Sequence, residues 1–231
     1  MARVRGCAPL LLLAVAVLGG CAAEGGLIEP PLVSLETGDP VADGRGLALI
    51  ADGRRVALAP PADLCVRSEA LHADGAAAVA QLAPCDAAIR PTVMRMISVS
   101  AASLAPQNAL GEALDLMAAE AASPGGWRAL GLGLGPPLNV LSATREGDAV
   151  FVVVEDATPA GALAIGRRCR AISQINERLV VVTVAALRSA AAPSAQRLQM
   201  EAARILAAVR DANPAPPRPA SRAERPPVAS I

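Results

Sequence analysis

Residues 149–156 read Ala-Val-Phe-Val-Val-Val-Glu-Asp, and the apolar part of this stretch decides the fold. A strand with one wet face alternates apolar and polar residues, whereas a strand buried on both faces is apolar throughout. The unbroken run from Val150 to Val154 therefore predicts a central strand that is buried on both of its faces.

Hairpins surround this central strand in the sequence. The turn Glu146-Gly147-Asp148 joins it to an earlier strand, and a second hairpin follows it, turning at residues 176–178. In the first half of the chain, Asp52-Gly53 between two apolar runs is a strong hairpin signal. The predicted strands are 47–51, 54–59, 64–67, 76–82, 92–100, 139–145, 149–156, 167–175 and 179–187.

Two segments change from the period of a strand to that of a helix. Residues 108–122 carry an apolar stripe, and Pro124-Gly125-Gly126 ends it. Residues 194–211 carry a second stripe, with Arg197, Glu201 and Arg204 expected on the wet side. The fold class predicted from these elements is α+β, an antiparallel β-sheet of hairpins flanked by two helices, in a single domain over residues 46–211. The stripe residues are Leu110, Leu114, Met117 and Ala121 in the first helix and Leu198, Ala202, Ile205 and Val209 in the second.

The first 20 residues have the pattern of an export signal. Arg3 and Arg5 form a basic head, and the apolar stretch from Cys7 to Leu18 is too short to span a bilayer, which needs about 20 apolar residues. The tetrapeptide Leu18-Gly19-Gly20-Cys21 resembles the lipobox of bacterial lipoproteins. The resemblance implies cleavage before Cys21 and attachment of lipid to its thiol. An ordinary secretory signal cleaved near Ala22-Ala23 is the alternative.

The segments on either side of the domain predict an anchor arm and a tail. Residues 21–45 are rich in Gly, Pro and acidic side chains, which is typical of a flexible tether. By analogy with the sorting rule of that lipoprotein family, Ala22 rather than Asp favours the outer over the inner membrane. Residues 212–231 contain six prolines and cannot build a core, so they predict a disordered tail. Its arginines could contact peptidoglycan or an acidic partner, or the tail could be passive.

The cysteines that remain after cleavage and lipidation are Cys65, Cys85 and Cys169. In an oxidising compartment Cys65 and Cys85 are the expected disulfide pair, because a turn at His72-Ala73-Asp74-Gly75 would bring their strands together. Cys169 is then unpaired. It is expected to be a buried, small apolar residue, with a reactive thiol as the alternative.

Composition argues against several classes of function. The 211 residues from Cys21 onward carry 19 Arg and 21 acidic residues, so the net charge of −2 offers no footprint for nucleic acid. The chain contains no Lys and no Tyr, which excludes lysine bases, Schiff bases and tyrosine acids. Its single histidine, His72, falls in the expected turn. Glu155 and Asp156 would point to opposite faces of a strand and make a poor acid–base pair. We therefore expect no enzyme, no cofactor and no metal site.

The second half of the chain carries a diffuse resemblance to one domain family. A strand at 149–155, a hairpin at 167–187 and a helix at 194–211 ending in Ala-Val-Arg is similar to the close of PsbP-like domains. The resemblance covers about 70 residues and implies an antiparallel sheet flanked by helices. It also implies binding or assembly rather than catalysis, and it transfers no catalytic residue.

Two functions follow as hypotheses. The first is a non-catalytic envelope lipoprotein, an adaptor or assembly module that is anchored through Cys21 and contacts another envelope protein. The second is a periplasmic module that binds a small molecule or lipid in a dry pocket between sheet and helices. A closed apolar cavity near Phe151 would support the second hypothesis and a filled core the first, and the shortage of aromatic residues favours the first.

Overall fold

The structure is a computed structural model of the 231-residue chain. It describes residues 33–36, 47–51, 53–73, 77–123, 126, 138–156, 166–187 and 193–214, with only the backbone at 33–36, 51, 68–73, 138 and 156. The strands are β1 (Val33–Glu36), β2 (Leu47–Ala51), β3 (Arg54–Leu58), β4 (Leu64–Ala73), β5 (Ala77–Pro84), β6 (Val93–Ser100), β7 (Leu138–Glu146), β8 (Ala149–Asp156), β9 (Arg167–Ile175) and β10 (Arg178–Ala186). The helices are the short 3-10 helix η1 (Gln107–Ala109), α1 (Leu110–Ala122) and α3 (Ala195–Asp211). None of the helices in these ranges is long and apolar enough to cross a membrane.

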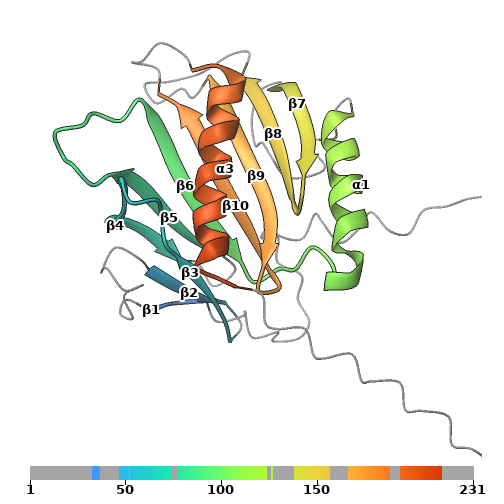
Figure 1. Cartoon of the computed structure of the whole chain (residues 1–231), viewed down its shortest axis with the longest axis horizontal. Coiled ribbons are helices and arrows are strands. Elements are labelled where there is room, and N and C mark those ends of the chain that lie inside the picture. Colours follow the sequence, from blue (N-terminus) through green and yellow to red (C-terminus); the bar gives the residue numbers. More distant parts are fainter. Residues whose placement is uncertain are drawn as a thin grey trace, which may run out of the picture.

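The strands form two antiparallel sheets (Figure 1). The larger sheet has seven strands in the order β4-β5-β6-β10-β9-β8-β7, and the smaller sheet has the order β1-β2-β3. Hairpins link most neighbours, but β6 pairs with β10 across a long stretch of sequence, with Val93 opposite Ala186 and Ser100 opposite Leu179. This pairing joins the two halves of the chain in one sheet. The predicted α+β fold of antiparallel hairpins with two flanking helices is confirmed.

Local chemistry explains the tight turns between strands. Gly53 and Gly147 have positive φ angles of 70° and 60°, which a residue without a side chain adopts at little cost. Between β9 and β10 the two turn residues, Asn176 and Glu177, also have positive φ angles, of 50° and 61°. Asn tolerates this region well. The turn is two residues long rather than the predicted three, so β10 begins at Arg178.

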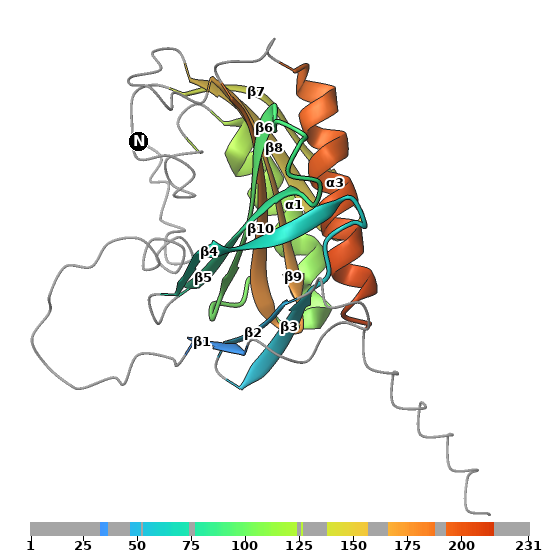
Figure 2. The same cartoon turned by 90° about the vertical axis from the view of Figure 1, so that its left-hand side faces the viewer.

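The two helices cover opposite faces of the large sheet. Ala149, Phe151 and Val153 of β8 belong to the core beneath α3, while Val150, Val152 and Val154 pack in a second cluster with α1. Successive strand residues point to opposite faces, so β8 lies between the two helices. All six residues are at most 3% exposed, which confirms that this strand is buried on both faces. Its predicted central position is wrong, because β8 lies next to the edge strand β7. Figure 2 shows α3 running along one face of the sheet.

The small sheet lies at the end of the domain where α3 finishes (Figure 2). β1 falls within the segment predicted as a tether, yet it pairs with β2, with Val33 opposite Ala51. At the other end of the chain, the Asn213 side chain accepts from the amide of Ala57 (2.8 Å) and donates to its carbonyl (2.7 Å). The described chain therefore enters and leaves the domain at the same end. Asn213 falls within the predicted tail, because the sequence pattern does not reveal a single amide that binds a strand edge.

Asn213 gives a test of where the domain ends. Replacing Asn213 with Ala should lower the free energy of unfolding by about 2 kcal/mol, because two hydrogen bonds to one backbone are lost together. Deleting residues 215–231 should leave the melting temperature within about 5 °C of the full chain, since this stretch has no apolar stripe. Thermal denaturation followed by circular dichroism measures both. A larger loss from the deletion than from the substitution would contradict this boundary.

Candidate functional site

The predicted disulfide is present. Cys65 and Cys85 are bonded, with an S–S distance of 2.06 Å and a Cα–Cα distance of 4.9 Å. Cys65 lies at the start of β4 and Cys85 directly follows β5, so the bond closes the open end of this hairpin. Both strands are longer than predicted, and a register shift between Arg67 and His72 interrupts their pairing. The proposed lipid-attachment residue, Cys21, lies outside the described residues.

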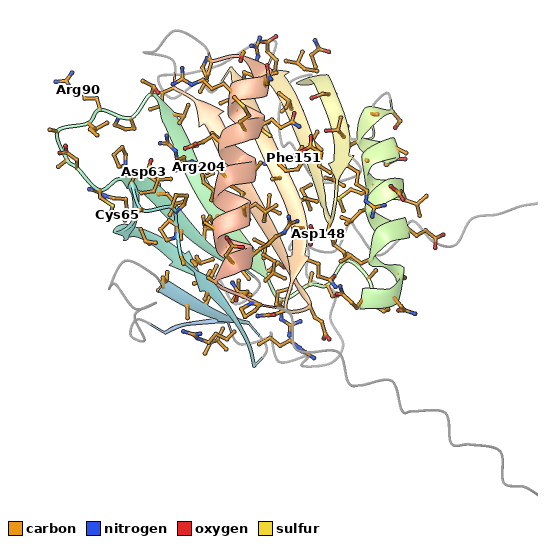
Figure 3. All side chains as sticks on the ribbon, in the orientation of Figure 1. Asp63, Cys65, Arg90, Asp148, Phe151 and Arg204 are labelled. Carbon is orange, nitrogen blue, oxygen red and sulfur yellow. A yellow bond between two sulfur atoms is a disulfide. The ribbon has the colours of Figure 1, made fainter. Side chains whose placement is uncertain are left out.

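The disulfide also anchors the start of a protruding loop to β4. Residues 85–92 connect β5 to β6 and extend away from the sheet, as the label of Arg90 shows in Figure 3. The Asp86 side chain accepts from the amide of Ala88 (2.9 Å), and the Asp86 carbonyl accepts from the amide of Ile89 (3.1 Å). Ile89 remains 55% exposed. The loop is thus held in one shape at its base and along its backbone.

Cys169 is a free thiol in the core. Its side chain is fully buried beneath α3, and this burial raises the pKa of the thiol to about 12. The thiolate is the reactive form, so a thiol with this pKa is unreactive near neutral pH. Cys169 therefore acts as a small apolar residue, as expected, and the reactive-thiol alternative has no support.

The other polar residues considered for chemistry were His72, Glu155 and Asp156. His72 was expected in a turn, but β4 continues to Ala73, and the backbone of His72 pairs with Val79. Glu155 is the last residue but one of β8 and binds Arg167 at 2.7 Å. The side chains of His72 and Asp156 lie outside the description. In the described ranges, no group of three His, Cys, Asp or Glu residues is placed to hold a metal ion.

A network of charged side chains fastens α3 to the sheet and to the turn before β4. Glu201 accepts from Arg95 of β6 (2.6 Å) and from Arg204 (3.0 Å), and Arg204 also binds Asp63 at 2.5 Å. Figure 3 shows Asp63 and Arg204 close together between α3 and β4. The Glu201 side chain is only 19% exposed, so its predicted place on the wet side of the helix is wrong. Arg95 attracts it inward.

The pKa directions agree with a structural role for this network. The hydrogen bond from Arg204 lowers the pKa of Asp63. Burial alone would raise the pKa of Glu201, but hydrogen bonds from Arg204 and Arg95 outweigh it and lower that pKa. The network also forms one wall of a cleft of about 420 Å³ between α3 and the start of β6. The charges of the network bind one another, and the exposed Arg197 also lines the cleft.

Two arginines in the first half of β9 differ from the charged residues of this network in having no described partner. Arg168 and Arg170 alternate with Cys169, so they lie on the face opposite α3, together with Ile172. Each is half-buried, and the buried Nε atom of each has no hydrogen-bond partner, a feature shared with Arg167 and Arg210. Neither side chain makes an ion pair or hydrogen bond with any described residue. We call these two residues the arginine pair.

The neighbours of the arginine pair across the sheet carry no charge. Arg168 lies between Val154 of β8 and Ala185 of β10, and Arg170 lies between Val152 and Thr183. One strand further, on β6, Met94 pairs with Ala185 and Met96 pairs with Thr183. The residues opposite the arginine pair are therefore apolar except for Thr183, which carries a hydroxyl group.

Other half-buried or buried arginines whose contacts are described do have partners. Arg95 binds Glu201, Arg167 binds Glu155, Arg178 donates to the Glu177 carbonyl, and Arg210 binds Asp148. The arginine pair is the exception to this pattern within the described ranges. Sequence reasoning treated these two residues only as neighbours of Cys169, although the spacing Arg-x-Arg-x-Ile within a predicted strand places them on one face.

No protein-family model, curated protein or solved structure matches this chain. Its function therefore has to be inferred from its own residues.

Proposed function

We propose that this protein is a membrane-anchored, non-catalytic lipoprotein of the bacterial cell envelope that acts as an adaptor or assembly module. The observation that carries the proposal is the Leu18-Gly19-Gly20-Cys21 tetrapeptide behind a short export signal. The disulfide between Cys65 and Cys85 supports it, because such bonds persist in oxidising compartments outside the cytoplasm. Anchoring through lipid on Cys21, preferentially to the outer membrane, is part of the proposal.

The position of β1 supports a short anchor arm. Only residues 22–32 separate Cys21 from Val33, the first residue of β1. A fully extended arm of this length spans at most about 40 Å. The small sheet then stays near the membrane, while the opposite end of the domain, with the loop 85–92 and the first turn of α3, is available to a partner.

The alternative, a module with a dry ligand pocket, has less support. Phe151 is 3% exposed and packs in the core beneath α3 with Leu198 and Ile205. Neither of the two clefts described along the sheet, the one beside α3 and the one beside the loop 85–92, is lined by Phe151. A filled core at this position favours the adaptor over the pocket.

The anchor is tested by replacing Cys21 with Ser. The hydroxyl cannot replace the thiol as the alkylated group, so the variant should lose all incorporation of a labelled fatty acid and should leave the membrane fraction. Metabolic labelling and fractionation measure both effects.

The matched control for this experiment is Cys7→Ser, a change of the same kind inside the segment that cleavage would remove. This control should keep label and membrane association. A Cys21→Ser protein that remains labelled and sediments with membranes would overturn the proposed anchor.

A further inference from the structure

The arginine pair carries a charge that the described part of the fold does not balance. Two residues along a strand are about 6.7 Å apart, so the positive charges of Arg168 and Arg170 repel each other at short range. Burial lowers the pKa of Arg170 to about 10, and the charge of Arg168 adds to the effect. The guanidinium group of Arg170 still carries its charge at neutral pH.

Unpaired charge that is partly withdrawn from water costs stability, and neutral side chains of similar size would avoid that cost. Elsewhere in the fold, Arg95, Arg167 and Arg210 each form an ion pair with a carboxylate. At the arginine pair, none of the residues directly opposite on the two neighbouring strands is acidic. Groups held at a cost to stability are typical of binding sites.

The charge and shape of the pair define the ligand that would balance it. A carboxylate brings one negative charge, whereas a phosphate monoester brings about 1.5 to 2 at neutral pH. Guanidinium groups bind phosphate oxygens through two parallel N–H donors, and two arginines on one strand can reach different oxygens of one phosphate. A phosphate monoester therefore matches the pair better than a carboxylate does.

We propose that Arg168 and Arg170 bind the phosphate group of a phosphate monoester. Thr183, beside Arg170, offers a further donor, and the half-buried Met94 and Met96 of β6 offer an apolar surface to the rest of the molecule. The inference rests on the proposed function in assigning a binding role to the domain, and it names the chemistry of what is bound.

The experiment titrates the detergent-solubilised full chain by isothermal calorimetry with inorganic phosphate, glycerol phosphate and dioctanoyl phosphatidic acid. All three should bind the wild type, while acetate should bind at least about tenfold more weakly. Arg170→Gln should reduce phosphate affinity at least about tenfold, and the double variant Arg168→Gln/Arg170→Gln should abolish measurable binding. The matched control is Arg197→Gln, an exposed arginine on α3, which covers the opposite sheet face, and it should bind as the wild type does.

The three ligands distinguish the source of the phosphate. Binding of glycerol phosphate as tight as that of phosphatidic acid assigns the site to soluble phosphate compounds. A preference of tenfold or more for phosphatidic acid assigns it to a lipid headgroup. No binding of any phosphate by the wild type overturns the inference, as does an equal loss of affinity in Arg197→Gln, because that loss would reflect overall charge. Neither outcome affects the proposed anchor, which the Cys21→Ser labelling tests separately.

Thermal denaturation provides a readout independent of affinity. In buffer without phosphate, Arg170→Gln should melt about 2–4 °C above the wild type, because one of two unpaired like charges is removed. Phosphate should raise the melting temperature of the wild type and leave that of the double variant unchanged. A melting temperature of Arg170→Gln below that of the wild type in both buffers would mean that the arginines are structural and would overturn the inference.

Discussion

Replacing Phe151 with Ala should lower the free energy of unfolding by about 3–5 kcal/mol, the largest effect of any single substitution considered for this domain. Phe151 is the only phenylalanine of the chain and is 3% exposed in the first half of β8. Its partners across the sheet are Thr144 and Ala171. Side chains of this size cannot fill the space that a phenyl ring leaves, so the cavity remains open.

Chemical denaturation with urea measures this loss. Phe151→Leu keeps most of the buried volume and should cost about 1.5 kcal/mol or less. Leu116→Ala removes a large apolar side chain that is 64% exposed on α1, and it should cost about 0.5 kcal/mol or less. If Phe151→Ala were no more destabilising than Leu116→Ala, the ring would not be packed in the core, and a ligand pocket at this position would regain support.

The double substitution Cys65→Ala/Cys85→Ala should cost about 3 kcal/mol. The bond closes a loop with a sequence separation of 20, and in the chain-entropy model its removal returns that loop's freedom to the unfolded chain. For a domain of this size the melting temperature should fall by about 6–12 °C. The loop 85–92 should also lose its fixed base, with faster proteolysis near the exposed Ile89 as a second readout.

A reducing agent provides the matched control for this variant. Reduction should bring the wild type down to the melting temperature of the double variant and should leave the variant itself unchanged. Cys169 is buried and unpaired, so it should not form a substitute bond in the variant. A double variant as stable as the oxidised wild type would contradict a stabilising role of the Cys65–Cys85 bond.

The sequence predicted the elements of this fold better than their assembly. Alternation and turn residues locate hairpins such as β2–β3 and β9–β10, since these signals depend on neighbouring residues. The apolar run of β8 predicted correctly that both its faces are covered. The pairing of β6 with β10 could not be predicted, because strand patterns do not specify distant partners.

The candidate site was harder to predict, because its significance lies in missing partners. The positions of Arg168 and Arg170 on one face follow from strand alternation, but the absence of an acid directly opposite them depends on which strands pair with β9. The ion pair of Glu201 also depends on which elements pack together in the fold. It borders the apolar stripe of α3 next to Leu198 and Ile205, and only the pairing with Arg95 turns it inward. A charged residue on the solvent-exposed face of a helix and one in a half-buried ion pair have the same local sequence pattern.

The intact mass of the protein, purified from membranes without reducing agent, tests the central claim most directly. The account predicts a chain that begins at Cys21, carries added acyl mass on that residue, and gains the mass of two hydrogens on reduction as the Cys65–Cys85 bond opens. A chain that retains Met1, or one that carries an unmodified thiol at Cys21, would contradict the claim that this is an exported lipoprotein.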